Sequence, residues 1–323
     1  MGVQDDYQYG YLDDDRRFAD QINGALFGGR QVVRPEELEQ MEPQIVYLGK
    51  KDEKGKRKNV KTTVDKARLW KGRQLHILVV ENQTQVDYHM VLRNMLSESL
   101  GYHKQWKKKY HHHAEKKDLR KGSDEFLSGM KKEEKFTPII TLVVYFGTEH
   151  PWDGARCLYE LLNIDEEMKE YITNYRLNLY DCQAHDTFEE YQTGLRQVFE
   201  TARYAKDKER LRKVMEENRE IYSRIDDETR EMMEVVANVK IPEEYKVVEN
   251  GEERYDMCQA FMDMRLEGYE EGITKGIEKG IRALIGACKK YGASREEILE
   301  ECMEGFALTR EKAEEYMEEH GKY

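Results

Sequence analysis

Three residues with metal-binding or phosphate-handling side chains stand near the ends of two expected strands. Glu81 and Gln83 follow a nearly continuous apolar run, residues 75–80, which is typical of a central strand covered on both faces. Alternate side chains of a strand share a face, so Glu81 and Gln83 are expected to point the same way. Asp65 lies in the preceding expected strand, and a tight turn at Lys71-Gly72 would bring it back beside Glu81.

The chemistry that this pair of carboxylates could support is metal-assisted hydrolysis. Two carboxylates on neighbouring strands repel each other unless a cation lies between them, and oxygen ligands favour Mg²⁺ or Mn²⁺. Such an ion activates a water molecule and stabilises the charge that grows on a phosphate during its transfer. The spacing leaves an alternative open, in which Glu81 only marks the exit of the strand to solvent and Asp65 sits in a turn.

Hydrophobic periodicity predicts the elements that must position these residues. Expected strands are 44–48, 60–70, 75–80, 139–146 and 176–181. Expected helices are 18–27, 86–109 and much of 188–238, with a break at Pro242 and a last helical region from about residue 256. The order predicts an α/β core over residues 1–185, a helical extension over 186–245 and a helical tail over 246–323.

Charge is distributed unevenly along the chain. The formal net charge is −12, yet residues 49–73 hold eleven Lys and Arg against three Asp and Glu, and residues 103–135 hold eleven against six. A basic middle between acidic ends can place a polyanion on one surface of an acidic protein. The alternative is that both basic runs are solvated loops.

Composition argues against several classes of protein. The 323 residues include five scattered cysteines without a CxxC pair, which disfavours a disulfide framework or a cysteine zinc site and fits a reducing cytoplasm. No apolar run is long enough to span a membrane, and the acidic start lacks the apolar stretch of a secretory signal. No GxxxxGK[ST] loop appears, so a nucleotide cofactor is not expected.

Two groups within the second basic run have competing interpretations. Trp106 and Tyr110 lie among lysines and could stack on bases, although such residues more often close a helix end. The tract His111-His112-His113 could hold a transition metal, but no further ligand has zinc-site spacing, which favours a solvated helix end or loop.

At the residues around Asp65 and Glu81 the sequence resembles a known family. The stretch VDKARLWKGRQLHILVVENQTQVDYHMVLRNM, residues 64–95, is similar to the Asp…Glu-x-Gln signature of the Rpn-like (YhgA-like) recombination-promoting nucleases, a transposase-like branch of the PD-(D/E)XK nuclease superfamily. The resemblance extends to FADQINGALFGG before this stretch, and to PIITLVVYFGTEHPWDGA and MCQAFMDMRLEGYEEGITKGIEKG after it. It covers most of residues 11–285, and it implies a restriction-endonuclease-like core with a central mixed sheet flanked by helices.

The resemblance also implies roles for individual residues. Asp65 and Glu81 would be metal ligands, with the backbone carbonyl of Asn82 as a third, and Gln83 would take the place of the superfamily's lysine and orient the attacking water. A glutamine carries no positive charge, so a nearby cation would have to substitute for the lysine. The candidates for that cation, and for contact with nucleic acid, are Lys66, Arg68 and Arg93. An acid on the first helix would assist, either Asp15 or Asp20. Family members usually carry Arg before the motif Asp, where this chain has Val64.

The tail contains glycines at every fourth position, Gly268, Gly272, Gly276 and Gly280, each followed by an isoleucine or by another large residue. On a helix these glycines form a slowly turning row that would allow a second helix to approach closely. The row predicts self-association, so a homo-oligomer is expected, and the alternative is a partly flexible tail.

Taken together, these features predict a Mg²⁺- or Mn²⁺-dependent endodeoxyribonuclease that hydrolyses phosphodiester bonds and acts in recombination, mobile elements or genome defence. Its expected partner is DNA, and its expected location is the cytoplasm. The alternative is a catalytically degenerate nuclease fold that is kept as a DNA- or protein-binding module.

Overall fold

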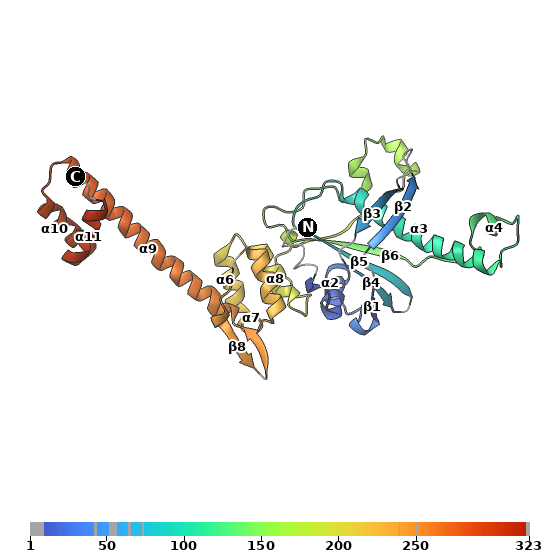
Figure 1. Cartoon of the computed structure of the whole chain (residues 1–323), viewed down its shortest axis with the longest axis horizontal. Coiled ribbons are helices and arrows are strands. Elements are labelled where there is room, and N and C mark those ends of the chain that lie inside the picture. Colours follow the sequence, from blue (N-terminus) through green and yellow to red (C-terminus); the bar gives the residue numbers. More distant parts are fainter. Residues whose placement is uncertain are drawn as a thin grey trace. The chain divides into compact units, whose positions relative to one another are not determined.

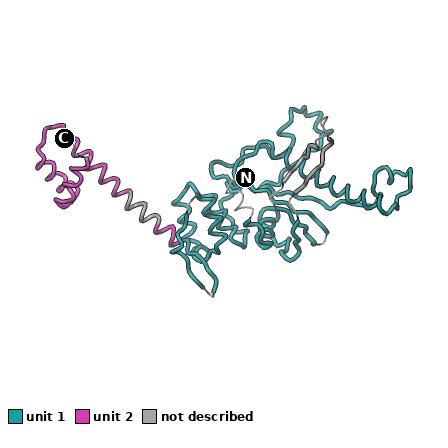
Figure 2. Tube along the Cα trace, in the orientation of Figure 1, with its two compact units in different colours: residues 1–257 teal, residues 258–323 magenta. Residues whose placement is uncertain are grey.

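The computed structural model describes residues 10–41, 44–51, 57–63, 66–72, 74–238, 240–249 and 251–320, with side chains described for these except 44–51, 57–63, 249, 264–271 and 320. The chain divides into two compact units, residues 1–257 and 258–323 (Figure 2). None of the helices in the described ranges is long and apolar enough to cross a membrane.

The first unit is built on a mixed sheet of five strands in the order β1-β4-β5-β6-β7 (Figure 1). Strands β1 and β4 run antiparallel to their neighbours, whereas β5, β6 and β7 are parallel. The strands are β1 (Leu38–Gln40), β4 (Lys66–Lys71), β5 (Leu75–Gln83), β6 (Ile139–Tyr145) and β7 (Asn178–Asp181). The apolar run in β5 is buried on both faces at Leu78, Val79 and Val80, as the sequence predicts for a central strand.

Two antiparallel hairpins accompany this sheet. The first joins β2 (Gln44–Lys51) and β3 (Arg57–Thr63), and the second joins β8 (Lys246–Glu249) and β9 (Glu252–Tyr255). The single strand expected over residues 60–70 is therefore wrong, because β3 ends at Thr63 and a separate strand, β4, begins at Lys66 in another sheet. The first basic run, residues 49–73, is therefore not a solvated loop throughout, because parts of it lie in β2, β3 and β4; residues 52–56 lie outside the described ranges.

Helices cover both faces of the sheet. The helices of the first unit are α2 (Asp15–Phe27), α3 (Met90–Lys116), α4 (Asp124–Ser128), α5 (Leu195–Tyr204), α6 (Lys208–Glu217), α7 (Arg219–Tyr222) and α8 (Asp227–Ala237). Helix α2 packs on the face that carries Arg68, whose guanidinium lies 5.1 Å from the centre of the Phe18 ring. Helix α3 covers the opposite face, runs beyond the sheet and carries α4 near its far end (Figure 1).

The helical extension shares one core with the sheet. The Phe199 ring of α5 stacks on Phe146, at the end of β6, with 5.1 Å between ring centres, and it also contacts Tyr180 of β7 and Tyr191. The boundary expected at residues 185/186 is therefore not a boundary between compact units, since the described unit continues to residue 257.

The second unit is helical. It is formed by α9 (Met257–Lys290), α10 (Arg295–Phe306) and α11 (Arg310–His320). A capping box joins Ser294 and Glu297 at the start of α10. The helices enclose a small core that includes Ile281, Ile285 and Leu299. The α/β class with a helical C-terminal region is confirmed.

Candidate active site

Strands β4 and β5 form the frame of the candidate site. Lys71 pairs with Leu75 across a tight turn, as expected, and Lys66 pairs with Val80 at the other end. Asp65 and Val64 lie outside the described residues, so of the expected carboxylate pair only Glu81 is described. In sequence, however, Asp65 directly precedes Lys66 and Glu81 directly follows Val80, which are a described antiparallel pair.

Glu81 is buried and bound to an arginine. Its side chain is 2% exposed, and Arg93 of α3 donates from Nη2 to its Oε2 atom at 2.7 Å. Nη1 of the same guanidinium donates to Asp87 at 3.3 Å. The alternative that Glu81 only marks the exit of a strand to solvent is therefore wrong.

The amide of Gln83 lies next to the carbonyl expected to bind metal. Gln83 Nε2 donates to the backbone oxygen of Asn82 at 2.8 Å. A carbonyl oxygen has two lone pairs and can accept a second partner. Gln83 also fixes the sheet here, because its own carbonyl accepts from Phe146 N at 2.8 Å. The described oxygens of Glu81, Asn82 and Gln83 are hard donors that suit Mg²⁺ or Mn²⁺ better than zinc.

Lys66 and Arg68 lie on the other face of the sheet from Glu81. Directly paired residues share a face, so Glu81 lies on the side of Ala67 and Val79, whereas Lys66 and Arg68 face α2. Lys66 is 4% exposed and ion-paired with Asp13, and Arg68 is 2% exposed. Neither can replace a lysine beside Glu81, and both are too buried to contact nucleic acid in this conformation. Of the three expected cations, Arg93 is the one beside Glu81.

The two acids considered for the first helix have other partners. Asp15 accepts from Arg68 Nε at 2.7 Å. Asp20 is buried and accepts from the backbone nitrogens of Gln192 and Thr193 and from the Thr193 hydroxyl at 2.7–3.0 Å. Burial raises the pKa of Asp20, and these hydrogen bonds oppose the rise. In this structure both carboxylates tie α2 to its surroundings and do not approach Glu81.

A metal centre of three clustered His, Cys, Asp or Glu side chains is not present within the described residues. The oxygen set that could hold an ion therefore rests on Glu81 and the Asn82 carbonyl, with Asp65 as the predicted further ligand.

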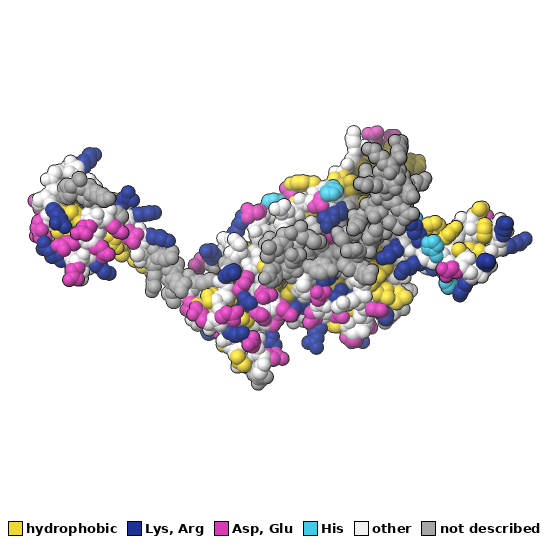
Figure 3. All heavy atoms as spheres, viewed as in Figure 1, with side chains coloured by type: hydrophobic (Ala, Val, Ile, Leu, Met, Phe, Trp, Pro, Cys, Tyr) yellow, Lys and Arg dark blue, Asp and Glu magenta, His cyan; other side chains and the backbone are white. Residues whose placement is uncertain are grey.

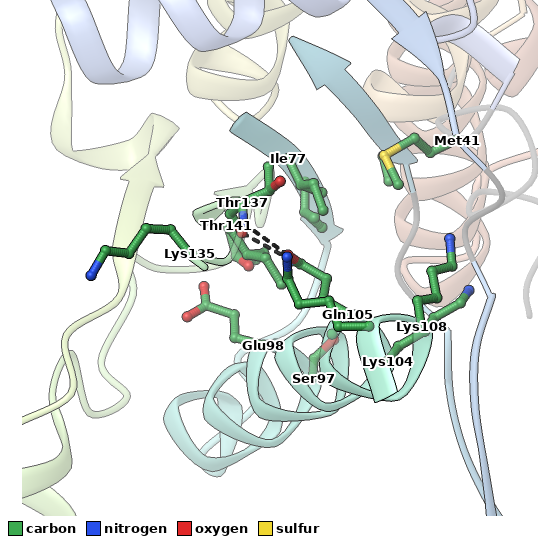
Figure 4. Close-up of a pocket in the computed structure, with 15 residues that line it drawn as sticks. Met41, Ile77, Ser97, Glu98, Lys104, Gln105, Lys108, Lys135, Thr137 and Thr141 are labelled. Carbon is green, nitrogen blue, oxygen red and sulfur yellow. Dashed lines mark hydrogen bonds between the residues drawn. The ribbon is translucent and has the colours of Figure 1, made fainter. Parts of the chain in front are cut away.

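A cavity of about 380 Å³ lies on the same face of the sheet, between α3 and strands β4, β5 and β6 (Figure 4). This cavity was not predicted from the sequence. Apolar side chains from the strands meet a stripe of α3 in which Ser97, Lys104 and Lys108 are polar and Gly101 has no side chain, at helical spacing. That three-to-four-residue spacing is the signal that could have revealed a polar inner face.

Glu98 of α3 also lines this cavity. Burial raises the pKa of the Glu98 carboxyl, against the lowering effect of hydrogen bonds from Thr141 and Tyr175. About two turns further along α3, Gln105 exchanges two hydrogen bonds with Thr137, at 2.8 and 2.9 Å, and so fixes α3 to the segment just before β6.

Helix α3 reaches Lys116, so the part of the second basic run before residue 117 is helix and not a solvated loop. Lys, Arg and His side chains gather beside apolar ones around the end of α3 and α4 (Figure 3). Trp106 Nε1 donates to Ser128 O at 2.9 Å, and its ring packs 5.6 Å from that of Tyr110. These rings hold the segment after α3 in place, in agreement with the structural alternative.

One histidine of the tract is buried. His113 is 5% exposed and lies between two carboxylates, with Nδ1 2.7 Å from Asp118 and Nε2 3.0 Å from Glu134. His111 and His112 are exposed, as expected for a solvated helix end. The two ring nitrogens of His113 point at different partners, so the arrangement is an ion-pair clamp and not a shared metal site.

Comparison with known proteins finds one family. A family model described as "Putative transposase, YhgA-like" matches residues 66–233, which is 168 of the 323 residues. No curated protein and no solved structure matches the chain.

Proposed function

Because the chain belongs to the YhgA-like transposase family, we propose that it is a metal-dependent DNA endonuclease with a PD-(D/E)XK core. The observation that supports this most is Glu81, a buried carboxylate at the end of a central strand, one residue beyond the pair that joins β5 to β4. A buried acid is costly unless it is paired or binds a cation, and such positions are typical of functional sites. A role in recombination, mobile elements or genome defence is part of the same proposal.

In this proposal Asp65, Glu81 and the Asn82 carbonyl hold the ion. A bound Mg²⁺ or Mn²⁺ supplies Lewis acidity and a water molecule of lowered pKa. Gln83 positions the water through its amide, but it cannot relay a proton as an ammonium group can. Arg93 is about one-third exposed and reaches both Glu81 and Asp87, so its guanidinium is placed to turn from a carboxylate to a phosphate oxygen.

The proposed partners are DNA and a second copy of the chain. Lysines on the outer turns of α3 would contact phosphates without regard to sequence, and such contacts weaken with salt. For self-association, Gly272 and Gly276 are exposed on α9, a methyl group added at either would have no described atom within 4 Å, and Ile273 is 45% exposed. A second helix could approach along this row.

A second candidate function is a DNA-binding module without catalysis. Two observations favour it: Gln83 stands where the superfamily has lysine, and the guanidinium of Arg93 already neutralises Glu81. In that case the family fold would bind DNA and leave it intact.

Plasmid nicking with Mg²⁺ or Mn²⁺ tests the proposal. We expect the wild type to nick and Asp65→Ala and Glu81→Ala to lose at least about a hundredfold in rate, since each removes a ligand of the ion. Glu217→Ala is the matched control, because this exposed acid pairs with Lys213 of the same helix, α6, and is not a proposed ligand. Equal nicking by all four proteins would remove the catalytic proposal, and binding without nicking by the wild type would establish the module instead.

A further inference from the structure

The cavity on the α3 side of the sheet has an apolar floor that α3 leaves partly uncovered. Ala67 and Val79 are buried there, and Met41, Ile77 and Ile139 pack against them while remaining partly exposed. A volume of about 380 Å³ is at the lower end of the range for small-ligand sites. The space therefore suits one flat or compact group and is too small for a duplex.

Hydrogen-bonding groups interrupt the apolar wall. The side chains of Ser97 and Thr141 are 4% and 3% exposed, and Glu98 projects toward Thr141 from α3 (Figure 4). Thr141 and Tyr175 already hydrogen-bond Glu98, but carboxyl and hydroxyl oxygens accept more than one hydrogen bond. A ring with nitrogen and oxygen atoms could therefore share these groups, whereas a hydrocarbon chain could not.

The rim is cationic. Four lysines line the cavity against a single acid, Glu98, among its described residues. Lys104 and Lys108 point from α3 on one side and Lys135 lies on the other (Figure 4), while Lys109 is held by Glu134 at 3.4 Å. The ligand that fits has a polar ring and at least one anionic group outside the ring, which is the chemistry of a nucleotide.

The cavity lies close to Glu81 along the same strand. Val79 lines the cavity and Glu81 is two residues further on the same face of β5, which corresponds to about 7 Å along the strand. A nucleotide held in the cavity would thus be a near neighbour of a phosphate at Glu81.

We propose that this cavity receives the base of an unpaired nucleotide, with the adjoining phosphates on its lysine rim, so that DNA with single-stranded or bulged nucleotides is the preferred substrate. The proposal rests on the proposed function for its link to cleavage. A paired base is stacked within the duplex and would have to leave the stack to enter, at a cost in free energy that an unpaired base avoids.

The test compares binding of three DNAs of one sequence: a single strand, a perfect duplex and a duplex with one bulged nucleotide. The full chain carries Glu81→Gln throughout, so that DNA is not consumed. Ser97→Met fills the cavity, and Leu96→Met is its control, because Leu96 is 49% exposed on α3 and does not line the cavity. We expect the unfilled protein to prefer single-stranded and bulged DNA by about tenfold, and Ser97→Met alone to abolish that preference.

A second measurement does not depend on the folding of the filled variant. A 4-thiothymidine at the bulge, irradiated in the complex, should crosslink to the peptides that line the cavity, on β5 or on α3 around Ser97. Crosslinks confined to other segments, equal affinity for the three DNAs, or an undiminished preference in folded Ser97→Met would overturn the proposal. So would thermal stabilisation by decanoate and not by thymidine 5′-monophosphate, since the occupant would then be a fatty acid.

The two proposals fail in different ways. If the wild type cleaves all three DNAs at equal rates, the cavity proposal is wrong and the nuclease proposal stands. If the wild type cleaves none of them with Mg²⁺ or Mn²⁺, yet Ser97→Met loses its binding preference, the nuclease proposal is wrong and the cavity proposal stands.

Discussion

At the scale of single residues, the proposed chemistry depends on how Glu81 is neutralised. The buried carboxylate is bound by Arg93, so the guanidinium and a divalent cation would compete for the same negative charge. The ion pair offsets part of the cost of burying this carboxylate.

Substitution of Arg93 tests this competition. We expect Arg93→Gln to lower the free energy of unfolding by about 2 kcal/mol in EDTA, because a buried carboxylate loses its charged partner. With saturating Mg²⁺ the loss should be smaller, and Mg²⁺ should bind more tightly than to the wild type. Urea unfolding in both conditions measures the effect, with Arg93→Lys as the charge-retaining control. The same loss with and without Mg²⁺ would show that no ion binds near Arg93.

Glu81 could be predicted from sequence, but the cations around it only in part. An apolar run that ends in Glu-x-Gln places Glu81 on one face, and the structure keeps it there. Lys66 and Arg68 were expected beside it, yet a step of one residue along a strand turns a side chain to the opposite face. Arg93 comes from another element, and its approach depends on how α3 packs. The position of Asp65 stays a prediction.

At the scale of elements, α3 does two tasks. Its first turns, including the buried residues Met90 and Asn94, pack on the sheet next to Glu81. Its last turns hold the segment 117–135, which we call the hook, through the rings of Trp106 and Tyr110 and the imidazole of His113. The lysines on the outer turns of α3, which we propose contact DNA, therefore lie next to a segment that is held in place.

The hook is expected to respond to pH. Hydrogen bonds to Asp118 and Glu134 raise the pKa of His113 above 6.5, so its stabilising effect is complete below that value and is lost as pH rises through the raised pKa. Lys131 first, and then His113, lower the pKa of Asp118 to about 2. A hydrogen bond from the backbone of Lys131, and then one from His113, lower the pKa of Glu134 to about 2. Both carboxylates therefore contribute their full stabilising effect above about pH 4.5. The hook should therefore be held best between about pH 4.5 and 6.5.

The indole N–H resonance of Trp106 reports on this clamp, because it donates to Ser128 in the hook. We expect the resonance to move as pH rises past the raised pKa of His113, and the transition to vanish in His113→Gln. His111→Gln is the control, since His111 is exposed on the same helix. An unchanged transition in His113→Gln would mean that another group controls the hook.

The clamp illustrates what periodicity cannot supply at this scale. Nothing in the spacing of His111-His112-His113 predicts that His113 is the buried member of the tract. Its partner Glu134 lies 21 residues further along the chain. Local sequence patterns can predict that a strand or a helix is present. The contacts that hold the hook depend on how its two ends come together in the fold.

At the scale of the whole molecule, the division of the chain follows packing and not the order of helices and strands. The helical extension was expected to be separate because only helices follow the last strand of the α/β core in the predicted order of elements. Yet Asp20 of α2 binds the turn before α5, and the rings of Phe146 and Phe199 stack across the two parts. Such long-range contacts cannot be predicted from the order of elements along the chain.

Two glycines of the α9 row should respond oppositely to alanine. Gly276 is exposed and has no described atom within 4 Å of an added methyl group, so Gly276→Ala should stabilise the second unit by about 1 kcal/mol through helix propensity. An added methyl group at Gly280 would lie 2.8 Å from the Phe306 ring, so Gly280→Ala should gain nothing or lose stability. Hydrogen exchange of α10 amides in the full chain measures both, and equal gains would contradict this packing.

The measurement that tests the central claim most directly is the position of a bound ion. A crystal soaked in Mn²⁺ and measured at the manganese absorption edge reveals the metal by anomalous scattering. We predict one peak in contact with carboxylate oxygens of both Asp65 and Glu81, with Arg93 displaced from at least one oxygen. An ordered site with no peak there, and with Arg93 still bound to Glu81 in saturating Mn²⁺, would contradict a metal-dependent nuclease.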